Sequence, residues 1–413
     1  MSFKDLKISK PILRAVAEAG YDNPTLVQEK TIPLVLENKD VIVSAQTGTG
    51  KTAAFALPIL QSLLDQQDAP KKGKTIKALI VSPTRELAIQ IDENFKTYSE
   101  YTNLRTTVIY GGASIEPQKE ILKKGVDVLI ATPGRLLDLH KQDSINLDYV
   151  DTLVLDEADL MLDMGFIDDV RKIERLCTKE KQILLFSATI PHKVEQLANS
   201  LLKNPDRIEV AQNSSTSKNV AQLLYYVPKP KKIELCLHLL RNTIKGNIIV
   251  FRRTKYGVDK LEKTLLKNNY KVDSIHGDKS QTARQDALTR FKKGEVNILI
   301  ATDVAARGID INDLDAVVNF DLPNVPETYV HRIGRTARAG NTGIAHSFCS
   351  ADEKSYIKTI QQLISLQLDV IEDHPYPLDP KAKPIIHTSN KTGSKHKKGR
   401  KSEASKKKKK RWY

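Results

Sequence analysis

Three carboxylates stand within four residues at Asp156, Glu157 and Asp159, directly after the apolar run 152–155. The run has the composition of a buried β-strand, so the carboxylates would lie at its carboxyl end. Such a group is either an acidic turn that faces water or part of a site that holds a metal ion. The four residues by themselves do not decide between the two.

A second stretch, from Ala45 to Thr52, has the composition of a loop that binds phosphate groups. Its glycines would let backbone N–H groups point at phosphates, and the N-terminus of the helix that follows adds positive potential. We expect Lys51 to reach the β- and γ-phosphates and the Thr52 hydroxyl to bind Mg²⁺. The residues predicted to hold the nucleotide are Ala45, Gln46, Thr47, Gly48, Thr49, Gly50, Lys51 and Thr52.

The phosphate loop supplies the partner that the acidic group needs. P-loop NTPases hold Mg²⁺ with a second acidic residue at the end of a neighbouring strand. Asp156 has that place and is the predicted metal ligand, while Glu157 would accept a proton from the attacking water or orient it. The loop departs from the usual pattern at Ala45, where glycine is expected, and its alternative reading is an ordinary Gly/Thr-rich turn.

Strand-like and helix-like segments alternate along most of the chain, which predicts an α/β fold with doubly wound parallel sheets. The polar, aperiodic stretch 211–219 is predicted to link two such domains, with a ligand-binding cleft between them. The expected strands are 41–43, 78–81, 107–110, 126–130, 152–155, 182–186, 247–251, 296–300 and 316–320. The expected divisions are 1–29, a first domain 30–210, the linker 211–219, a second domain 220–370 and a tail 371–413.

The charge of the chain is concentrated in the tail. Residues 381–413 contain 12 lysines and 2 arginines against one acid, Glu403, which accounts for +13 of the net charge of +15. A segment of this composition is predicted to be disordered. It is either an inert solvated segment or a tether that attracts polyanions such as nucleic acids through counterion release.

The remaining composition is that of a globular protein, with 40% hydrophobic and 28% charged residues. No apolar run approaches the length of a membrane span, and the N-terminus lacks the apolar core of a signal peptide. The three cysteines are far apart and predict neither a disulfide framework nor a zinc site. A cytoplasmic location is therefore expected.

Taken in order, the motifs resemble those of the DEAD-box ATP-dependent RNA helicases, and the resemblance covers residues 1–370. Residues 20–28, GYDNPTLVQ, are similar to the family's adenine-reading Q motif, which makes 1–29 the Q-motif region. The resemblance implies that the Gln28 amide binds the adenine edge and that Tyr21 stacks on the base. Leu26 and Val27 stand where the family more often has Pro-Ile.

The resemblance also implies contacts to the RNA sugar–phosphate backbone, which carry no sequence information. The residues concerned are Thr84, Arg85, Gly112, Thr132 and Arg135 in the first domain and Arg252, Asp278 and Thr302 in the second. Each of these loops, taken alone, would be an ordinary Pro/Gly turn with a surface arginine. Ser187 and Thr189 resemble the motif that couples hydrolysis to strand separation, and we expect them to bond with Asp159.

The stretch YVHRIGRTAR, residues 329–338, is similar to the motif that completes the family's ATPase site. Arg335 and Arg338 are three residues apart, so a helix would place them on one face. The resemblance implies that both act as arginine fingers, that His331 belongs to the catalytic residues and that Asp310 contacts the ribose. The alternative is a solvated surface helix.

The family resemblance implies two RecA-like domains that close over ATP, Mg²⁺ and single-stranded RNA, with RNA-stimulated hydrolysis driving local, non-processive unwinding. Ala337, Ala339, Gly340 and residues 114–118 are most similar to the bacterial RhlE-type subgroup. A monomer is expected, with RNA as partner and ribosomal particles or the RNA-decay machinery as candidates. Two alternatives stay open: an ATP-dependent RNA clamp or assembly factor with little unwinding, and a DNA helicase on the same architecture.

Overall fold

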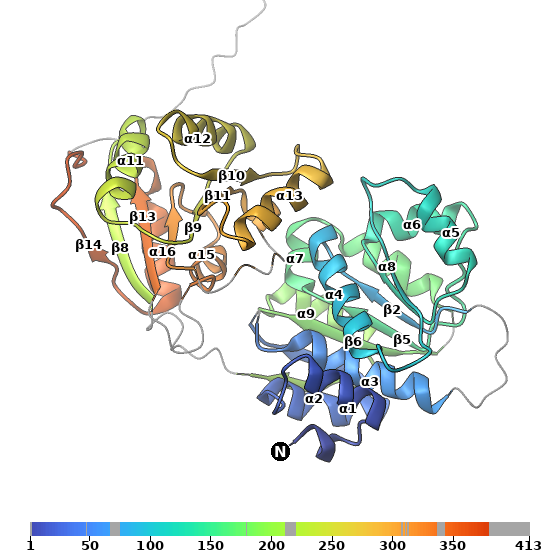
Figure 1. Cartoon of the computed structure of the whole chain (residues 1–413). Helices are drawn as coiled ribbons and strands as arrows, with labels where there is room; N and C mark the ends of the chain where they lie inside the picture. The colour runs from blue at the N-terminus through green and yellow to red at the C-terminus, as the bar shows by residue number, and fades with distance from the viewer. Residues whose placement is uncertain are drawn as a thin grey trace, which may run out of the picture.

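The computed structural model describes residues 2–46, 48–66, 75–178, 180–210, 220–306, 309, 311, 314–336 and 343–379. These residues form two α/β domains joined in tandem (Figure 1), as the sequence predicts. The predicted linker 211–219, the residues from 380 onward, and Thr47, Asp310 and Arg338 lie outside the described residues. Within the described part, no helix is both long enough and apolar enough to cross a bilayer.

The first domain is built on a seven-stranded sheet in the order β3-β4-β2-β5-β6-β1-β7, in which all pairings are parallel. The strands are β1 (Val41–Ser44), β2 (Ala78–Val81), β3 (Thr106–Ile109), β4 (Val128–Ala131), β5 (Thr152–Leu155), β6 (Gln182–Ser187) and β7 (Asp206–Glu209). The sequence missed β7 because this edge strand buries Ile208 alone among charged residues. A charged edge strand lacks the apolar run that marks an interior strand.

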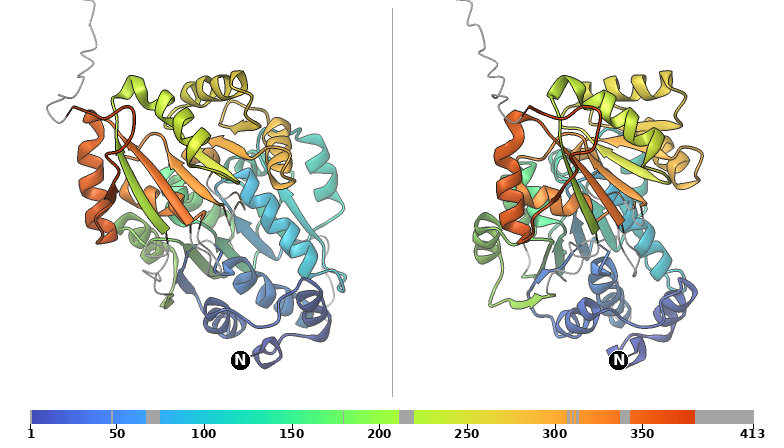
Figure 2. Two further views of the ribbon diagram at one scale, coloured as in Figure 1. Left: turned by 60° about the vertical axis from the view of Figure 1, so that its left-hand side comes forward. Right: turned by 90° about the vertical axis from the view of Figure 1, so that its left-hand side faces the viewer.

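Side chains of the first sheet alternate between two cores, because successive residues of a strand point to opposite faces. Val41 and Val43 enter one core and Ile42 the other. Helices cover both faces (Figure 2). The helices are η1 (Phe3–Leu6), α1 (Lys10–Glu18), α2 (Leu26–Leu36), α3 (Lys51–Asp65) and α4 (Arg85–Tyr98) on the first core, and α5 (Glu116–Lys123), α6 (Pro133–Lys141), α7 (Ala158–Asp163), α8 (Ile167–Leu176) and α9 (His192–Leu201) on the second.

The N-terminal region is part of the first domain. Phe3, Ile12 and Ile32 are buried in the same core as Phe55 of α3. The helices of the predicted Q-motif region are therefore held against the helix that follows the phosphate loop.

The second domain repeats the topology of the first. Its sheet has the order β10-β11-β9-β12-β13-β8-β14, which is the first order with seven added to each number. The strands are β8 (Val220–Tyr226), β9 (Ile248–Phe251), β10 (Val272–Ile275), β11 (Ile298–Ala301), β12 (Ala316–Asn319), β13 (Gly343–Cys349) and β14 (Asp369–Val370). The helices are η2 (Lys229–Lys231), α11 (Lys232–Asn242), α12 (Lys255–Lys267), α13 (Gln281–Lys292), α14 (Asp303–Ala306), α15 (Pro326–Ile333), η3 (Ala351–Glu353) and α16 (Lys354–Ile364).

The second domain extends past residue 370, where the sequence places the start of the tail. The Ile371 N–H donates to the Leu224 carbonyl and the Leu378 N–H to the Tyr226 carbonyl, each at 2.9 Å. Ile371 and Tyr376 also pack against the core. The apolar residues of 371–379 are scattered among acidic residues and prolines without a run or a period, so the sequence pattern missed this continuation.

The buried His346 is expected to make the second domain less stable in acid. Its Nδ1 lies 3.1 Å from the Tyr225 hydroxyl, and burial lowers its pKa from 6.5 to about 4. The unfolded chain therefore binds more protons than the folded one as the pH falls through this window. Stability present above pH 6.5 should be lost toward pH 4, by on the order of 3 kcal/mol.

Replacing His346 by glutamine is therefore expected to flatten the dependence of unfolding free energy on pH between 6.5 and 4. Urea denaturation followed by circular dichroism across this range measures the slope. His192→Gln, at an exposed site on α9, is the matched control and should retain the parental slope. An unchanged slope in His346→Gln would contradict the assignment.

Candidate nucleotide and RNA site

The phosphate loop connects β1 to α3 at the carboxyl edge of the first sheet. Gly50 has φ 87° and directly precedes Lys51, the first residue of α3. A Cβ at Gly50 would lie 2.3 Å from Nε2 of Gln28, so the backbone approaches the Q motif more closely than any other residue type would allow. The loop is thereby attached to the N-terminal region.

Lys51 and Glu157 meet in a buried ion pair. Nζ of Lys51 lies 2.9 Å from Oε1 of Glu157, and the two side chains are 6% and 10% exposed. Burial opposes the charge on Lys51, yet the carboxylates of Glu157 and Asp156 outweigh it and raise the lysine pKa. The structure thus brings together the two residues that the sequence assigns to phosphate binding and to the attacking water.

Glu157 has an unusual backbone conformation. It lies between β5 and α7 with φ 54° and ψ 55°, a left-handed conformation that is rare for residues other than glycine and asparagine. Such strain costs on the order of 1–3 kcal/mol and occurs preferentially at functional sites. The turn places its carboxylate on Lys51 while Asp156 lies one residue earlier.

Asp156 has a carboxylate oxygen without a hydrogen-bond partner. Its Oδ1 is buried and unpaired, and burial together with the charge of Glu157 raises its pKa. A bound cation would satisfy such an oxygen. The chemistry suits Mg²⁺, which proteins bind through one or two side chains together with substrate phosphates, and the half-buried Thr52 in the first turn of α3 offers a hydroxyl.

Asp159 connects the acidic turn to the end of β6. Its Oδ2 accepts from the Thr189 N–H at 3.0 Å and from the Thr189 hydroxyl at 2.9 Å. Its own N–H donates to Ser187 Oγ at 3.1 Å, and that hydroxyl donates to the Thr189 carbonyl. The expected bonding of Asp159 with Ser187 and Thr189 is therefore present.

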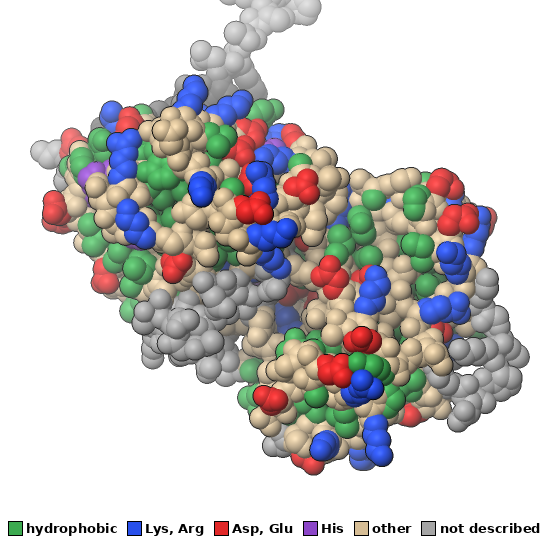
Figure 3. Space-filling view, viewed as in Figure 1, with side chains coloured by type: hydrophobic (Ala, Val, Ile, Leu, Met, Phe, Trp, Pro, Cys, Tyr) green, Lys and Arg blue, Asp and Glu red, His purple; other side chains and the backbone are tan. Residues whose placement is uncertain are grey.

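Asp159 also interacts electrostatically with the second domain. Burial opposes its ionisation, but the charges of His331 and Lys51, with the hydrogen bonds from Thr189 and Ser187, hold its pKa below the ordinary value. His331 lies on α15, so α15 and the acidic turn face each other across the two domains. The space-filling view (Figure 3) shows the surface hollowed between the domains, with charged side chains in the hollow.

The Q-motif amide is bonded to backbone atoms. Oε1 of Gln28 accepts from the Thr25 N–H at 2.9 Å, and its Nε2 donates to the Gly50 carbonyl at 3.2 Å. Tyr21 is 44% exposed with its ring edge-on to Tyr98. Gln28 therefore supports the phosphate loop in this structure, and its contact with adenine stays a prediction, as does stacking by Tyr21.

The three predicted RNA loops of the first domain lie together. The Arg85 guanidinium packs over Gly112, where a Cβ would come within 2.1 Å of it. Arg135 Nη2 donates to the Ala113 carbonyl at 2.9 Å, and its Nη1 is buried without a partner. Thr84 and Thr132 are buried at the N-cap positions of α4 and α6, and the Thr84 hydroxyl accepts a hydrogen bond from the Leu87 N–H. The loops form one rim, whose contact with RNA remains a prediction.

The predicted RNA residues of the second domain have less uniform surroundings. Arg252 donates to Asp321 at 2.8 Å and lies 4.1 Å above the Phe320 ring, so it is held by its own domain. Asp278 is exposed and pairs with Lys255 at 2.5 Å. Thr302 precedes α14, and its carbonyl accepts from the Ala306 N–H. Asp278 is exposed and Thr302 partly exposed, as residues that bind RNA would be, whereas the Arg252 side chain is engaged within its own domain.

The two domains contact each other through an ion pair that the sequence analysis did not single out. Arg284 of α13 lies 2.9 Å from Oε1 of Glu86 in α4, with side chains 11% and 3% exposed. Gln281 donates to the same oxygen at 3.2 Å. The pattern Q-x-x-R was a possible signal, but its partner is identifiable only once the domains are placed.

Reversing one charge of this pair should weaken domain closure. Burying like charges in place of a buried pair costs about 2–5 kcal/mol, so Glu86→Arg or Arg284→Glu should raise the RNA concentration for half-maximal ATPase more than tenfold. The double exchange should recover part of the loss, which a double-mutant cycle measures. Glu93→Arg, at an exposed site on α4, is the control. Additive losses in the double variant would contradict the contact.

Arg335 and its neighbour Arg332 are both buried but differ in their partners. Arg335 donates to the carbonyls of Ile309 at 2.6 Å and Ala306 at 3.5 Å. Arg332 forms a bidentate pair with Asp303 at 2.6 and 2.8 Å and also donates to Asn319. Arg332 is thus held by a carboxylate, whereas the described bonds of Arg335 include these two backbone carbonyls. The finger role of Arg335 remains a prediction.

Comparison with known proteins identifies the family. The family model described as DEAD/DEAH box helicase matches residues 25–197, and the helicase conserved C-terminal domain matches residues 231–340. The DEAD-box ATP-dependent RNA helicase RhpA of Helicobacter pylori is 43% identical over 371 residues, which are 90% of this chain and 74% of that protein. The chain belongs to the DEAD-box ATP-dependent RNA helicases. It accordingly hydrolyses ATP and unwinds RNA.

This helicase has other relatives of similar identity. The DEAD-box helicase CshA of Bacillus subtilis is 42% identical over 373 residues, covering 90% of this chain and 74% of that protein. These names do not separate an RhlE-type subgroup, which stays a prediction.

Among solved structures, the helicase is similar to complexes with RNA. Mss116p bound to single-stranded RNA and AMP-PNP has a TM-score of 0.82 at 31% identity, covering 91% of this chain and 80% of that one. S. cerevisiae Dbp5 bound to RNA and ADP BeF3 has a TM-score of 0.78 at 30% identity, covering 90% of this chain and 95% of that one. A DEAD box protein of Methanococcus jannaschii has a TM-score of 0.50 at 39% identity, covering 90% and 99%.

Proposed function

We propose that the two domains of this helicase close over ATP and single-stranded RNA, and that closure completes the catalytic site. The observation that carries the proposal is the buried ion pair of Lys51 and Glu157. The neighbouring Asp159 interacts electrostatically with His331 on α15, so this pair lies beside the second domain. The TM-scores support this closure. The RNA complexes of Mss116p and Dbp5 have higher TM-scores than the Methanococcus jannaschii protein, although their sequence identities to this chain are lower.

In this mechanism the first domain binds and orients the phosphates. Lys51 and the backbone N–H groups of the loop hold the β- and γ-phosphates, and Glu157 accepts the proton of the attacking water or orients it. Asp156 and Thr52 would hold Mg²⁺, which when bound neutralises the charge that develops on the phosphates. The raised pKa of Lys51 ensures that it carries its charge before the phosphates arrive.

The second domain contributes Arg335, which would exchange or share its carbonyl bonds to stabilise the transferring phosphate. Asp159 would couple phosphate transfer to the RNA-binding loops, since its carboxylate accepts a hydrogen bond from Thr189 and interacts with His331. A two-state closure of this kind is reciprocal, so RNA should raise ATP affinity by the same factor as ATP raises RNA affinity.

We propose that this helicase discriminates RNA from DNA by contacts along the sugar–phosphate backbone, where the 2′-hydroxyl distinguishes the two. The test compares RNA and DNA duplexes of one sequence in strand displacement, and ATP hydrolysis with each single strand. RNA should be unwound and should stimulate turnover. Equal unwinding of DNA would favour the DNA helicase, and RNA-stimulated ATPase without unwinding would favour the RNA clamp.

The lysine-rich segment 381–413 would tether RNA electrostatically, and ribosomal particles or the RNA-decay machinery are candidate partners. We also propose a cytoplasmic monomer. The three cysteines, which are buried and free, suit a reducing compartment.

A further inference from the structure

Helix α12 presents an exposed face made of one tyrosine and three lysines. Tyr256, Lys260, Lys263 and Lys267 follow each other at intervals of four, three and four residues, so they lie along one side of the helix. The four side chains are exposed, and Tyr256 is 76% exposed, more than any other large hydrophobic residue among those described. We call these four residues the α12 stripe.

The acidic residues of α12 point to other partners. Asp259 hydrogen-bonds His276 at 2.9 Å, and Glu262 pairs with Lys279 at 3.1 Å. In the part of the chain that the structure describes, no acidic side chain forms an ion pair with the three lysines of the stripe. The α12 stripe therefore presents three uncompensated positive charges beside an exposed aromatic ring.

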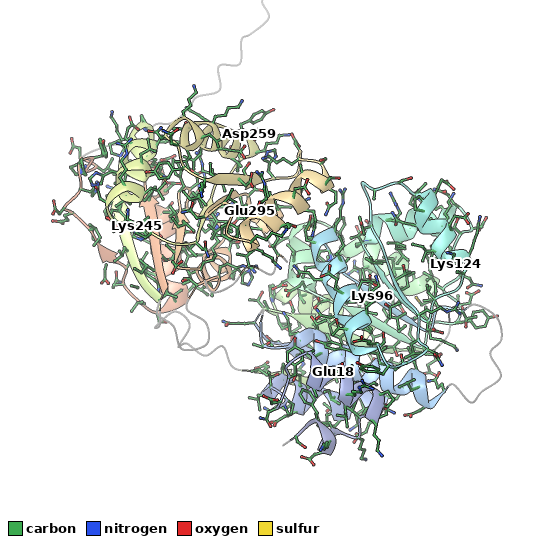
Figure 4. The ribbon with its side chains drawn as sticks, viewed as in Figure 1. Glu18, Lys96, Lys124, Lys245, Asp259 and Glu295 are labelled. Atoms are coloured by element: carbon green, nitrogen blue, oxygen red, sulfur yellow. The ribbon has the colours of Figure 1, made fainter. Side chains whose placement is uncertain are left out.

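The stripe begins where the predicted RNA rim of the second domain ends. Lys255 lies between the two, because its Nζ is 2.5 Å from Asp278 and 5.5 Å from the centre of the Tyr256 ring. Asp259, in the second turn, is labelled at the end of α12 nearer the first domain (Figure 4). The α12 stripe thus extends outward from the rim over about 16 Å, at 1.5 Å per residue from Tyr256 to Lys267.

We propose that the α12 stripe binds the single-stranded RNA flank that leaves the segment clamped between the domains. Lysines attract the phosphates through counterion release, and an exposed aromatic ring stacks on an unpaired base. An unpaired strand fits better than a duplex, whose bases already stack on each other and cannot reach Tyr256. This proposal rests on the proposed function, in which the two domains clamp single-stranded RNA, and it extends the RNA contact onto α12.

The test uses the full chain, a non-hydrolysable ATP analogue and three RNAs. The first fills only the clamped segment, the second adds a single-stranded flank, and the third adds a duplex arm of equal charge. The flank should tighten binding to the parent protein. In the triple variant Lys260→Gln/Lys263→Gln/Lys267→Gln, the affinity gained from the flank should fall roughly five- to tenfold. The slope of log affinity against log salt concentration should fall in magnitude by about 2, since each lost phosphate contact removes about 0.7.

Tyr256→Ala should lower the affinity for the flanked RNA by about fivefold or more and leave the affinity for the duplex-arm RNA unchanged. The control variant removes three exposed lysines elsewhere, with Lys4→Gln/Lys245→Gln/Lys358→Gln, and should keep the parental ratio between flanked and short RNA. An unchanged ratio in the stripe variants overturns the inference, as does an equal loss for all three RNAs. If the parent fails to bind the short RNA, the proposed function itself fails.

Discussion

Replacing Glu157 by glutamine is expected to slow RNA-stimulated ATP hydrolysis by roughly 10²–10⁴-fold, the range that one general acid–base group contributes. Glutamine keeps the shape and can still accept a hydrogen bond from Lys51, which now lies 2.9 Å from Oε1. ATP should therefore still bind and the domains should still close on RNA. Because hydrolysis no longer reopens them, the variant should hold RNA in a long-lived complex with ATP.

Single-turnover hydrolysis and the dissociation rate of labelled RNA measure the two halves of this prediction. Glu174→Gln is the matched control, since Glu174 lies on α8 and pairs with Lys181, which directly precedes β6. It should hydrolyse ATP and release RNA as the parent does. Release of RNA at the parental rate by Glu157→Gln would show that Glu157 does not position the attacking water.

Replacing Arg335 by alanine should lower hydrolysis by roughly 10³–10⁵-fold, the contribution of arginine fingers in other phosphoryl-transfer enzymes. Lysine at this position should recover little, because it lacks the planar fork of the guanidinium. RNA binding with a non-hydrolysable ATP analogue should suffer far less than turnover. Single-turnover hydrolysis at saturating ATP and RNA is the measurement.

Arg332 provides the comparison that separates catalysis from folding. The Arg332 side chain is buried at 2% exposed and its bidentate partner Asp303 is 26% exposed. Arg332→Ala should therefore lose about 3 kcal/mol of stability, the low end for breaking a buried pair. Arg335 donates to carbonyl groups of Ile309 and Ala306. If the loss of hydrolysis in Arg335→Ala only followed a loss of folded protein in thermal melts, the finger role would be wrong.

Local patterns predicted the fold class and the centre of the candidate site. An apolar run followed by carboxylates, or a glycine loop followed by helical residues, depends on neighbours within one strand or one turn. That is why the strand before Asp156 was predicted with its correct bounds, 152–155, and why a helix was expected after the phosphate loop, where α3 begins at Lys51. Strands with mixed polarity were missed for two reasons: β7 is a charged edge strand with one buried residue, and β10 is buried although Asp273 and Ser274 interrupt its apolar pattern.

Individual roles were less predictable than elements. Gln28 is predicted to bind adenine, and the structure adds that its amide donates to the Gly50 carbonyl of the phosphate loop. Arg252 is predicted to bind RNA, and the structure adds that its guanidinium lies against Asp321 and Phe320. A polar side chain can bond to whichever partner the fold brings near, and the sequence does not state which partner that is.

The sequence by itself determined the two-domain α/β architecture, the phosphate loop, the acidic turn and the order of the motifs. Only the tertiary structure decided that Glu157 sits on Lys51, 106 residues away, and that Gln281 and Arg284 meet Glu86, which is 195 residues from Gln281. It also left Asp156 Oδ1 unpaired and the α12 stripe exposed. The physical reason is that short-range pattern sets which elements form, whereas burial and pairing depend on groups that chain folding brings together from distant positions.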